Sequence, residues 1–230
     1  MIIWNWLIWK ALQRIDSTEY VFFASWVSDS KTSDISQFQR EIDLLNQYIN
    51  PGNKKLIYFS SCSIYDSSLS DKPYVKHKLN IESIIEHNCK NYLIVRIWNI
   101  VGSGWNAKTI MNFLHDSIIN NSVIDIWNWA KRNILDVDDL VKMLELYLLR
   151  HSLQKKENIN INNPDGYKIL EIVKTFEKQL WKKGKYNILE KWDWISFDKE
   201  ISETLFQELD INKDTYLYNI INKYYIWNKA

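Results

Sequence analysis

The chain has 230 residues, 46% hydrophobic and 25% charged, with a formal net charge of +1. This length fits one large domain, or one domain with a small appendage, and the balanced charge gives no reason to expect nucleic acid or a membrane surface as partner. No apolar run approaches the roughly 20 residues of a membrane helix and no basic leader opens the chain, so we expect a cytoplasmic protein. Cys62 and Cys89 have no partner at metal-ligand spacing, which favours a reducing compartment and no metal site.

Strands and helices alternate along the first 150 residues. The expected strands cover residues 1–4, 20–24, 55–60, 92–97 and 123–127. The expected helices cover residues 8–15, 35–48, 73–87, 109–119 and 136–149. The strands are nearly continuous apolar runs such as YVFFA and KLIYFS, which is typical of parallel strands covered by helices on both faces. The pattern predicts an α/β fold, a Rossmann-like doubly wound parallel sheet.

The final third carries shorter elements. Strands are expected at 158–161 and 186–189, and helices at 169–181, 200–208 and 215–225. Because the rhythm changes near residue 155, we expect a dinucleotide-binding domain of residues 1–150. Residues 151–230 would form a small C-terminal substrate lobe within the same compact unit.

Tryptophan marks the opening stretch, MIIWNWLIWKAL. Trp4, Trp6 and Trp9 have the spacing W-x-W-x-x-W, which matches the glycines of the dinucleotide fingerprint G-x-G-x-x-G. The chain has only 5 glycines but 12 tryptophans. Glycine is usually about 7% of a protein. A glycine deficit and a tryptophan excess of similar size suggest a single exchange.

The strongest chemical signal is a Tyr-x-x-x-Lys pattern on the helix that follows YFSSCSIYD. Four-residue spacing places Tyr74 and Lys78 on one helix face. A lysine ammonium favours the phenolate and lowers the tyrosine pKa, so this tyrosine could act as acid or base near neutral pH. A hydroxyl at the end of the preceding strand could hold a substrate oxygen. The alternative is a surface pair without a role.

These residues resemble the extended short-chain dehydrogenase/reductase superfamily, the NAD-dependent epimerase/dehydratase family. SSCSIYD is similar to its SS-x-x-V-Y-G segment, which precedes the Y-x-x-x-K helix. The resemblance implies that Ser61 takes the catalytic serine place, with Ser63 as runner-up. It implies that Tyr74 is the acid/base, and that Lys78 binds the nicotinamide ribose and lowers the tyrosine pKa.

Two further stretches resemble the same family. LIVRIWNIVGSGWN is similar to its R-x-x-N-x-x-G-x-G segment, and AKRNILDVDDLVKML to its R-D-(Y/F)-(I/V)-x-V-x-D-(L/V) segment. The resemblance implies that Asn99 and Arg132 bind substrate together with Ser63, the arginine by contacting phosphates. The alternatives are a turn residue for Asn99 and a surface ion pair for Arg132. We read Asp136, Asp138 and Asp139 as helix-start acids rather than metal ligands, and His77 and His115 as ordinary surface or half-buried histidines.

The resemblance also implies a cofactor and a substrate. The cofactor would be NAD or NADP, and the substrate a sugar or nucleotide-sugar of polysaccharide precursor synthesis. The reaction would be hydride transfer during oxidation, reduction, dehydration or epimerisation. The cofactor residues would be Trp4, Trp6, Leu7, Ile8, Trp9, Ala24, Ser25, Tyr74 and Lys78. The helices after Ile35 and Ser61 could form the homodimer interface common in the family.

The chain departs from the family in three ways. Only one helix separates the first strand from YVFFA, so the family's second and third strands are missing, together with the residue that selects NAD or NADP. The stretch from Ser61 to Tyr74 is short, which predicts a more open pocket. Bulky residues at the fingerprint positions, and Trp26 beside the cofactor, should block the approach of the pyrophosphate.

Three hypotheses follow for the tryptophans. The chain could be a working oxidoreductase whose loops are rebuilt around tryptophan. It could be a non-catalytic Rossmann-fold pseudoenzyme or partner protein with a closed dinucleotide site. Or it could be altered from a sequence that read MIIGNGLIGKAL, to which the function belongs. Trp4 and Trp6 as simple core fillers would explain one or two tryptophans but not the ordered spacing.

Overall fold

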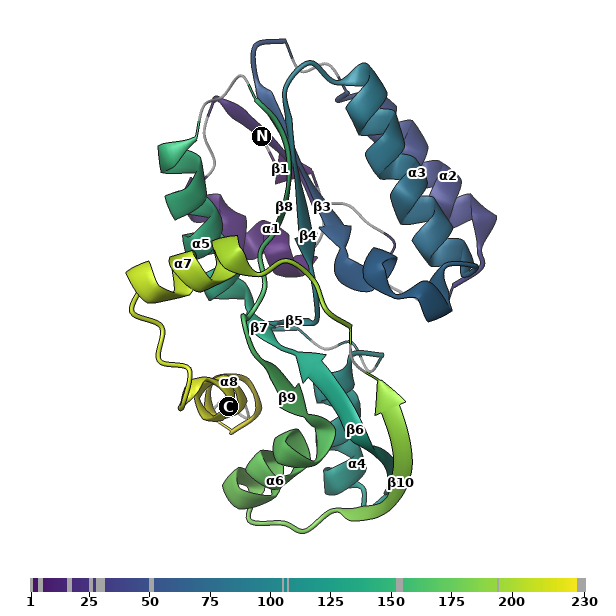
Figure 1. Cartoon of the computed structure of the whole chain (residues 1–230), viewed down its shortest axis with the longest axis vertical. Helices are drawn as coiled ribbons and strands as arrows, with labels where there is room; N and C mark the ends of the chain where they lie inside the picture. The colour runs from purple at the N-terminus through teal and green to yellow at the C-terminus, as the bar shows by residue number, and fades with distance from the viewer. Residues whose placement is uncertain are drawn as a thin grey trace.

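A parallel sheet of five strands forms the upper body of the molecule in Figure 1. The computed structural model describes residues 2–3, 6–15, 18–24, 27, 32–49, 52–104, 106, 108–151, 155–193 and 195–226, with side-chain surroundings for all of these except 2, 3, 6 and 193. In spatial order the strands are β1 (Ile2–Ile3), β2 (Tyr20–Phe23), β3 (Lys55–Ser61), β4 (Tyr92–Ile97) and β8 (Lys156–Asn160). All neighbouring strands in this sheet are parallel.

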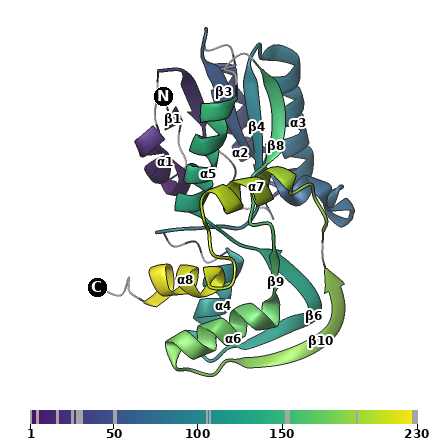
Figure 2. The ribbon, with the colours of Figure 1, turned by 60° about the vertical axis from the view of Figure 1, so that its left-hand side comes forward.

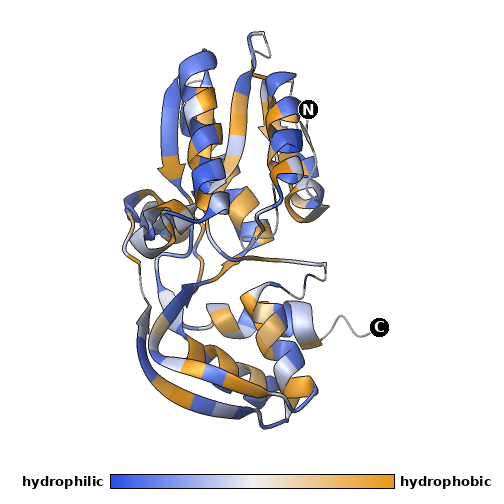
Figure 3. Ribbon diagram, turned by 90° about the vertical axis from the view of Figure 1, so that its right-hand side faces the viewer, coloured by the Kyte–Doolittle hydropathy of each residue, from blue (hydrophilic) through white to orange (hydrophobic). Residues whose placement is uncertain are grey.

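Helices cover both faces of this sheet (Figure 1). One face carries α1 (Trp6–Leu12), continued by a 3-10 turn at Gln13–Ile15, and α5 (Val137–Arg150); the other carries α2 (Ile35–Asn46) and α3 (Pro73–Asn88). The apolar run of β3 is buried almost throughout because helices lie on both sides of it. The helices carry both hydrophobic and hydrophilic stripes, as Figure 3 shows. The predicted α/β fold with a doubly wound parallel sheet is confirmed.

Short polar signals determine where these helices begin. Asp34 caps α2 by accepting a hydrogen bond from the backbone N–H of Ser36 at 2.9 Å. Asp136 caps α5 in the same way, accepting from the N–H of Asp138 at 2.8 Å. Pro73 stands in the first turn of α3, where its missing N–H costs nothing. The acidic residues at 136 and 138 therefore serve a helix start, as the sequence indicates.

The connections β1–α1–β2 and β2–α2–β3 have opposite hands. Both step in the same direction across the sheet, yet α1 and α2 lie on opposite faces (Figure 1). Because such crossovers are right-handed in about 98% of cases, one of the two is an exception. A complete doubly wound sheet has strands on both sides of its first strand, whereas β1 is an edge strand within the described residues. This agrees with the expected loss of two strands.

A second, three-stranded sheet forms the lower part of the molecule (Figures 1 and 2). Its order is β10-β6-β9, with β6 parallel to β10 and antiparallel to β9. Its elements are α4 (Ile110–Ile119), β6 (Val123–Asn133), β9 (Gly166–Lys168), α6 (Ile169–Leu180) and β10 (Lys185–Asp193). The remaining elements are 3-10 turns at Cys62–Tyr65 and Ser67–Leu69, the paired strands β5 (Ile100–Val101) and β7 (Leu135–Asp136), and α7 (Glu200–Glu208) and α8 (Tyr216–Ile221), with a π-helical turn at Asn222–Ile226.

Both sheets contain segments from before and after residue 150. Strand β8 follows that residue but pairs with β4, whereas α4 and β6 precede it and belong to the lower part, where β6 pairs with β10. The boundary expected between residues 1–150 and 151–230 therefore does not coincide with the sheets. The change of rhythm near residue 155 marks shorter elements and not a change of sheet, which no local pattern reveals. Strands β6 and β10 also extend beyond the expected 123–127 and 186–189.

Trp181 stands in a glycine-like position. It follows the last residue of α6 with φ 52° and ψ 33°, the left-handed conformation that ends many helices on glycine. Its side chain is 94% exposed, so no packing offsets the strain.

Replacing Trp181 with glycine is therefore expected to stabilise the protein by about 1 kcal/mol. The measurement is urea unfolding of both proteins. A matched control is Lys178→Gly, inside the same helix on its exposed side, which should cost about 1 kcal/mol. A loss of stability in Trp181→Gly would contradict the conformational argument.

Candidate active site

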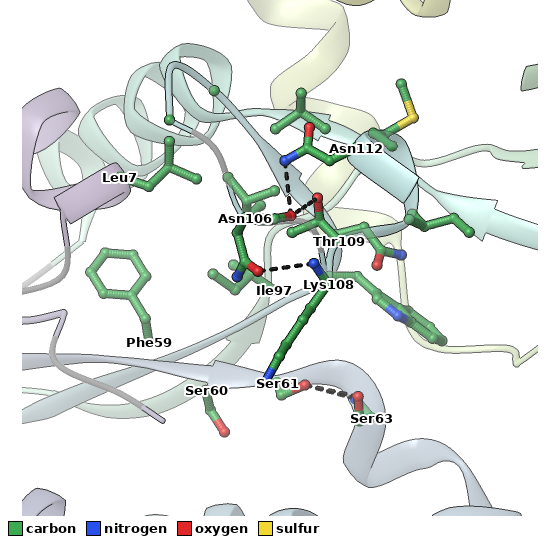
Figure 4. Close-up of a pocket in the computed structure, with 18 of the residues that line it drawn as sticks. Leu7, Phe59, Ser60, Ser61, Ser63, Ile97, Asn106, Lys108, Thr109 and Asn112 are labelled. Atoms are coloured by element: carbon green, nitrogen blue, oxygen red, sulfur yellow. Dashed lines mark hydrogen bonds between the residues drawn. The ribbon is translucent and has the colours of Figure 1, made fainter. Parts of the chain in front are cut away.

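A cavity of about 460 Å³ opens at the carboxyl ends of β3 and β4 (Figure 4). Ligands of open parallel sheets bind outside this edge. The cavity is lined by side chains from the end of β3, the start of α3, the loop after β4 and the start of α4, namely Ser60, Ser61, Ser63, Tyr74, Lys78, Trp98, Asn99, Lys108, Thr109 and Asn112, together with Leu7 of α1 and Tyr225 of the C-terminal turn. The structure thus brings the predicted Ser61, Tyr74 and Lys78 to one cavity.

Ser61 is the last residue of β3 and its hydroxyl is held in place by the turn that follows. Its Oγ accepts a hydrogen bond from the N–H of Ser63 at 3.1 Å and lies 3.0 Å from the Oγ of Ser63, to which it donates. Extended backbone at Ser61 makes it the cap of the 3-10 turn Cys62–Tyr65. The sequence SSCS therefore presents two hydroxyls side by side at the strand end (Figure 4).

Tyr74 lies in the first turn of α3 and is only 8% exposed. Burial raises the pKa of its phenol to about 12; a hydrogen bond with Ser61 lowers it and the charge of Glu41 raises it. The lowering of this pKa that was expected from Lys78 is not seen, because burial outweighs the neighbouring groups. The charge of Lys78 is also balanced by a carboxylate.

Lys78 is buried, and its ammonium has hydrogen-bond partners on α2 and β3. Nζ donates to Oε1 of Glu41 at 2.9 Å and to the Tyr58 hydroxyl at 2.7 Å. It lies 5.9 Å from the ring centroid of Tyr74. Burial lowers the pKa of Lys78 and the Glu41 carboxylate opposes this. The pair Tyr74 and Lys78 therefore shares one helix face, as predicted, but the lysine carries a partner that the pattern does not show.

Two of the three predicted substrate residues line the cavity and the third does not. Asn99 lines the cavity, and its Nδ2 donates to the carbonyl of Asn133 at 2.9 Å, which joins the loop after β4 to β6. Ser63 also lines it. Arg132 lies on β6, where its Nη1 donates to the carbonyl of Lys131 at 2.8 Å, and it is not among the residues that line the cavity.

The predicted cofactor residues divide into three groups. Leu7 lines the cavity, whereas Ile8 and Ala24 are fully buried in the core and Trp9 is half-buried. Trp4, Ser25 and Trp26 lie outside the described residues, and for Trp6 only the backbone at the start of α1 is described.

Gly102 explains how close α1 comes to the site. A β-carbon at Gly102 would lie 2.6 Å from Cδ1 of Leu7 and 2.6 Å from Cγ1 of Val137. The loop after β4 can therefore approach α1 and α5 only with glycine at this position. This glycine belongs to the segment that resembles R-x-x-N-x-x-G-x-G.

Sequence reasoning missed several residues of the site. His77 is 6% exposed, with Nε2 2.9 Å from a Glu41 oxygen, so the expectation of an ordinary surface or half-buried histidine is wrong. Lys108 reaches across the cavity toward Ser61 in Figure 4. The sequence does indicate that Glu41 faces the interior, because Phe38, Glu41 and Leu45 have the spacing of one helix face.

The C-terminal turn closes one side of the cavity. Lys223 bridges the carboxylates of Asp136 and Asp138 at 2.8 and 2.7 Å, and the hydroxyl of Tyr225 donates to Asn112 Oδ1 at 2.6 Å. These contacts tie the last described residues to the starts of α5 and α4. Within the described ranges no group of three or more His, Cys, Asp or Glu could hold a metal ion, and no helix is long and apolar enough to cross a bilayer.

The fold is that of the NAD-dependent nucleotide-sugar epimerases and dehydratases, which agrees with the resemblance drawn from the sequence. No protein-family profile and no curated protein matches the chain. Solved structures do. UDP-glucose-4-epimerase from Stenotrophomonas maltophila, with bound NAD and formylated UDP-arabinopyranose, has a TM-score of 0.68 and 17% identity over 90% of this chain and 75% of that one.

Two further structures show the same likeness. UDP-glucose 4-epimerase from Bifidobacterium longum, in complex with NAD+ and UDP, has a TM-score of 0.67 and 16% identity over 93% of this chain and 78% of that one. UDP-glucuronic acid 4-epimerase from Bacillus cereus, in complex with UDP-glucuronic acid and NAD, has a TM-score of 0.61 and 20% identity, with the same coverage. At these identities the likeness establishes the fold, and the chemistry of this chain is argued from its own residues.

Proposed function

We propose that this fold serves an NAD(P)-dependent oxidoreductase, epimerase or dehydratase acting on a sugar or nucleotide-sugar through Ser61, Tyr74 and Lys78. The observation that carries the proposal is the shared cavity of these three residues at the carboxyl edge of the parallel sheet. Support comes from the similar structures, which were solved with NAD and UDP-sugars or UDP.

The residues of the cavity fit the catalytic half of such a site. The nicotinamide, when bound, supplies the hydride acceptor or donor for a sugar carbon. With its pKa raised to about 12, Tyr74 is a phenol at neutral pH and can donate its proton to a sugar oxygen. Ser61, oriented by Ser63, holds the same oxygen by a hydrogen bond. Lys78 supplies positive charge beside Tyr74 and would bind the nicotinamide ribose.

Other residues of the cavity would bind the substrate and the cofactor. Asn99 and Ser63 would hold the sugar nucleotide, and Leu7 would lie against the cofactor. Arg132 would need to reach the phosphates from β6. Within the described residues no strand lies between β1 and β2 to carry the residue that selects NAD or NADP.

The proposal includes an oligomeric state and a cellular location. A homodimer through α2 and α3 is supported by apolar side chains on their outer surface, since Ile35 is 78% and Leu79 46% exposed. The protein would work in the cytoplasm and supply sugar precursors for polysaccharides.

The competing function is a non-catalytic Rossmann-fold partner protein whose dinucleotide site is closed by Trp4, Trp6 and Trp9. The fingerprint spacing favours this alternative for the chain with tryptophan at these positions. Calorimetric titration with NAD and NADP separates the two. Binding at micromolar to millimolar cofactor supports the oxidoreductase function. No binding at millimolar cofactor would exclude this function for the chain with tryptophan at these positions.

A further inference from the structure

Glu41 of α2 lies at the centre of a buried cluster behind the cavity. Its Oε1 accepts hydrogen bonds from Lys78 Nζ and from the Tyr58 hydroxyl, each at 2.9 Å. Its Oε2 accepts from the N–H of Val27 at 3.1 Å and lies 2.9 Å from Nε2 of His77. The glutamate is 2% exposed, so its charge is tolerated only because both oxygens have partners.

The cluster also determines the charge around the proposed acid/base. The titratable groups that act on Lys78 or pack around it are Glu41 from α2, Tyr58 from β3, and Tyr74, His77 and Glu82 from α3. Glu82 is engaged by Arg96, whose guanidinium lies 2.7 and 3.1 Å from its two oxygens. The carboxylate that lies in direct contact with the lysine is therefore Glu41.

We propose that Glu41 is a positioning residue, which holds Lys78 beside Tyr74 and balances the charge that the tyrosine experiences. This inference rests on the proposed function of Lys78. Lys78 and His77 hold the pKa of Glu41 at about 2 although burial alone would raise it, so the carboxylate is ionised at any working pH. The same carboxylate raises the pKa of Lys78 and of Tyr74. A single side chain on another helix thus acts on the pKa of both members of the Tyr-x-x-x-Lys pair.

The test is the titration of Lys78 in Glu41→Gln, followed by NMR of lysine labelled at Cε and assigned through Lys78→Met. Glutamine keeps the shape and removes the charge, so the pKa of Lys78 should fall by about one to three pH units. The control Asp43→Asn removes an exposed carboxylate from the same helix and should leave Lys78 unchanged. An unchanged Lys78 titration in folded Glu41→Gln would overturn the proposal.

A second variant keeps the test usable if Glu41→Gln does not fold. Tyr58→Phe removes one acceptor of Lys78 and one donor to Glu41, and it should lower the pKa of Lys78 by a smaller amount. No change in this variant would also count against the proposal. The readout needs neither cofactor nor substrate, so failure of the proposed enzyme function and failure of this inference are distinguishable.

Three features of the tryptophans, which do not depend on Glu41, support a second inference. Trp181 adopts the left-handed backbone of a glycine cap. None of the tryptophans with described side chains is buried, although this residue type is highly buried on average; these are Trp9, Trp98, Trp127, Trp129, Trp181 and Trp192. The pattern W-(N/D)-W recurs at 4–6, 127–129 and 192–194, and its first copy is the start of the fingerprint spacing.

The composition supports the same conclusion. The 5 glycines and 12 tryptophans together are 17 of 230 residues, which is close to the usual share of glycine alone, about 7%. A register shift in the pairing of β10 with β6 lies between Leu189 and Trp192, and glycine is common at such irregularities. One replacement rule, tryptophan in place of glycine, therefore accounts for these observations and for the spacing of the three tryptophans of the fingerprint.

We infer that the natural protein carries glycine at all 12 tryptophan positions, because one codon is decoded as glycine in its source cell and as tryptophan in the sequence as written. The test is peptide mass spectrometry of the protein purified from that cell, and it does not depend on any activity. Every tryptophan-containing peptide should be lighter by the mass difference between tryptophan and glycine at each position. A tryptophan mass at any of these positions would overturn the inference.

Discussion

Tyr74→Phe is expected to lower turnover by about 10²- to 10⁴-fold in a chain that binds its cofactor, while the fold and cofactor affinity stay the same. The variant removes only the hydroxyl that exchanges a proton with the sugar oxygen. The aromatic ring remains, so the buried contacts of Tyr74 at the start of α3 are kept. Steady-state kinetics with UDP-sugars measures the loss, and circular dichroism and calorimetry check the fold and the cofactor affinity.

Tyr65→Phe is the matched control for this variant. Its hydroxyl donates to Asn160 at 2.9 Å and accepts from Arg96 at 2.8 Å, and Tyr65 does not line the cavity. Turnover should therefore stay within a few-fold. Equal losses in the two variants would show that Tyr74 acts through the packing of the site and not through proton transfer.

Glycine at positions 4, 6 and 9 is expected to raise the affinity for NAD or NADP at least about 100-fold, or by about 2.7 kcal/mol. The first glycine of the fingerprint permits the tight turn after β1, the second lets the backbone touch the pyrophosphate, and the third allows close packing of the helix and strand. Calorimetric titration of the two proteins measures the difference.

Trp181→Gly serves as the control for this exchange. It makes the same chemical change at the end of α6, outside the residues that line the cavity, so cofactor affinity should not move. If the chain with three restored glycines binds no better than the original, the fingerprint assignment is wrong.

The strands and helices of the sheet could be predicted because they follow local patterns. Apolar runs predicted β2, β3 and β4, and the helices expected from residues 35 and 73 begin where α2 and α3 begin. Nothing local indicates that β8 returns to the first sheet or that β6 leaves it. Those pairings depend on contacts between segments far apart in the chain.

The site could be predicted for residues that belong to a motif and not for those that support them. Tyr74 and Lys78 were predicted from their spacing and Ser61 from the family resemblance, and the structure places all three at one cavity. Glu41 and His77 were missed because a buried charge is recognised by its partners, which come from different elements. The raised pKa of Tyr74 was missed for the same reason.

The proposed site is tested most directly by a crystal structure of the chain with glycine at 4, 6 and 9, grown with NAD. We expect a nicotinamide in the cavity, within hydrogen-bond reach of Tyr74, with its ribose at Lys78. We also expect the pyrophosphate at the start of α1. A cavity that stays empty at saturating NAD, or a dinucleotide bound elsewhere on the molecule, would contradict the proposal.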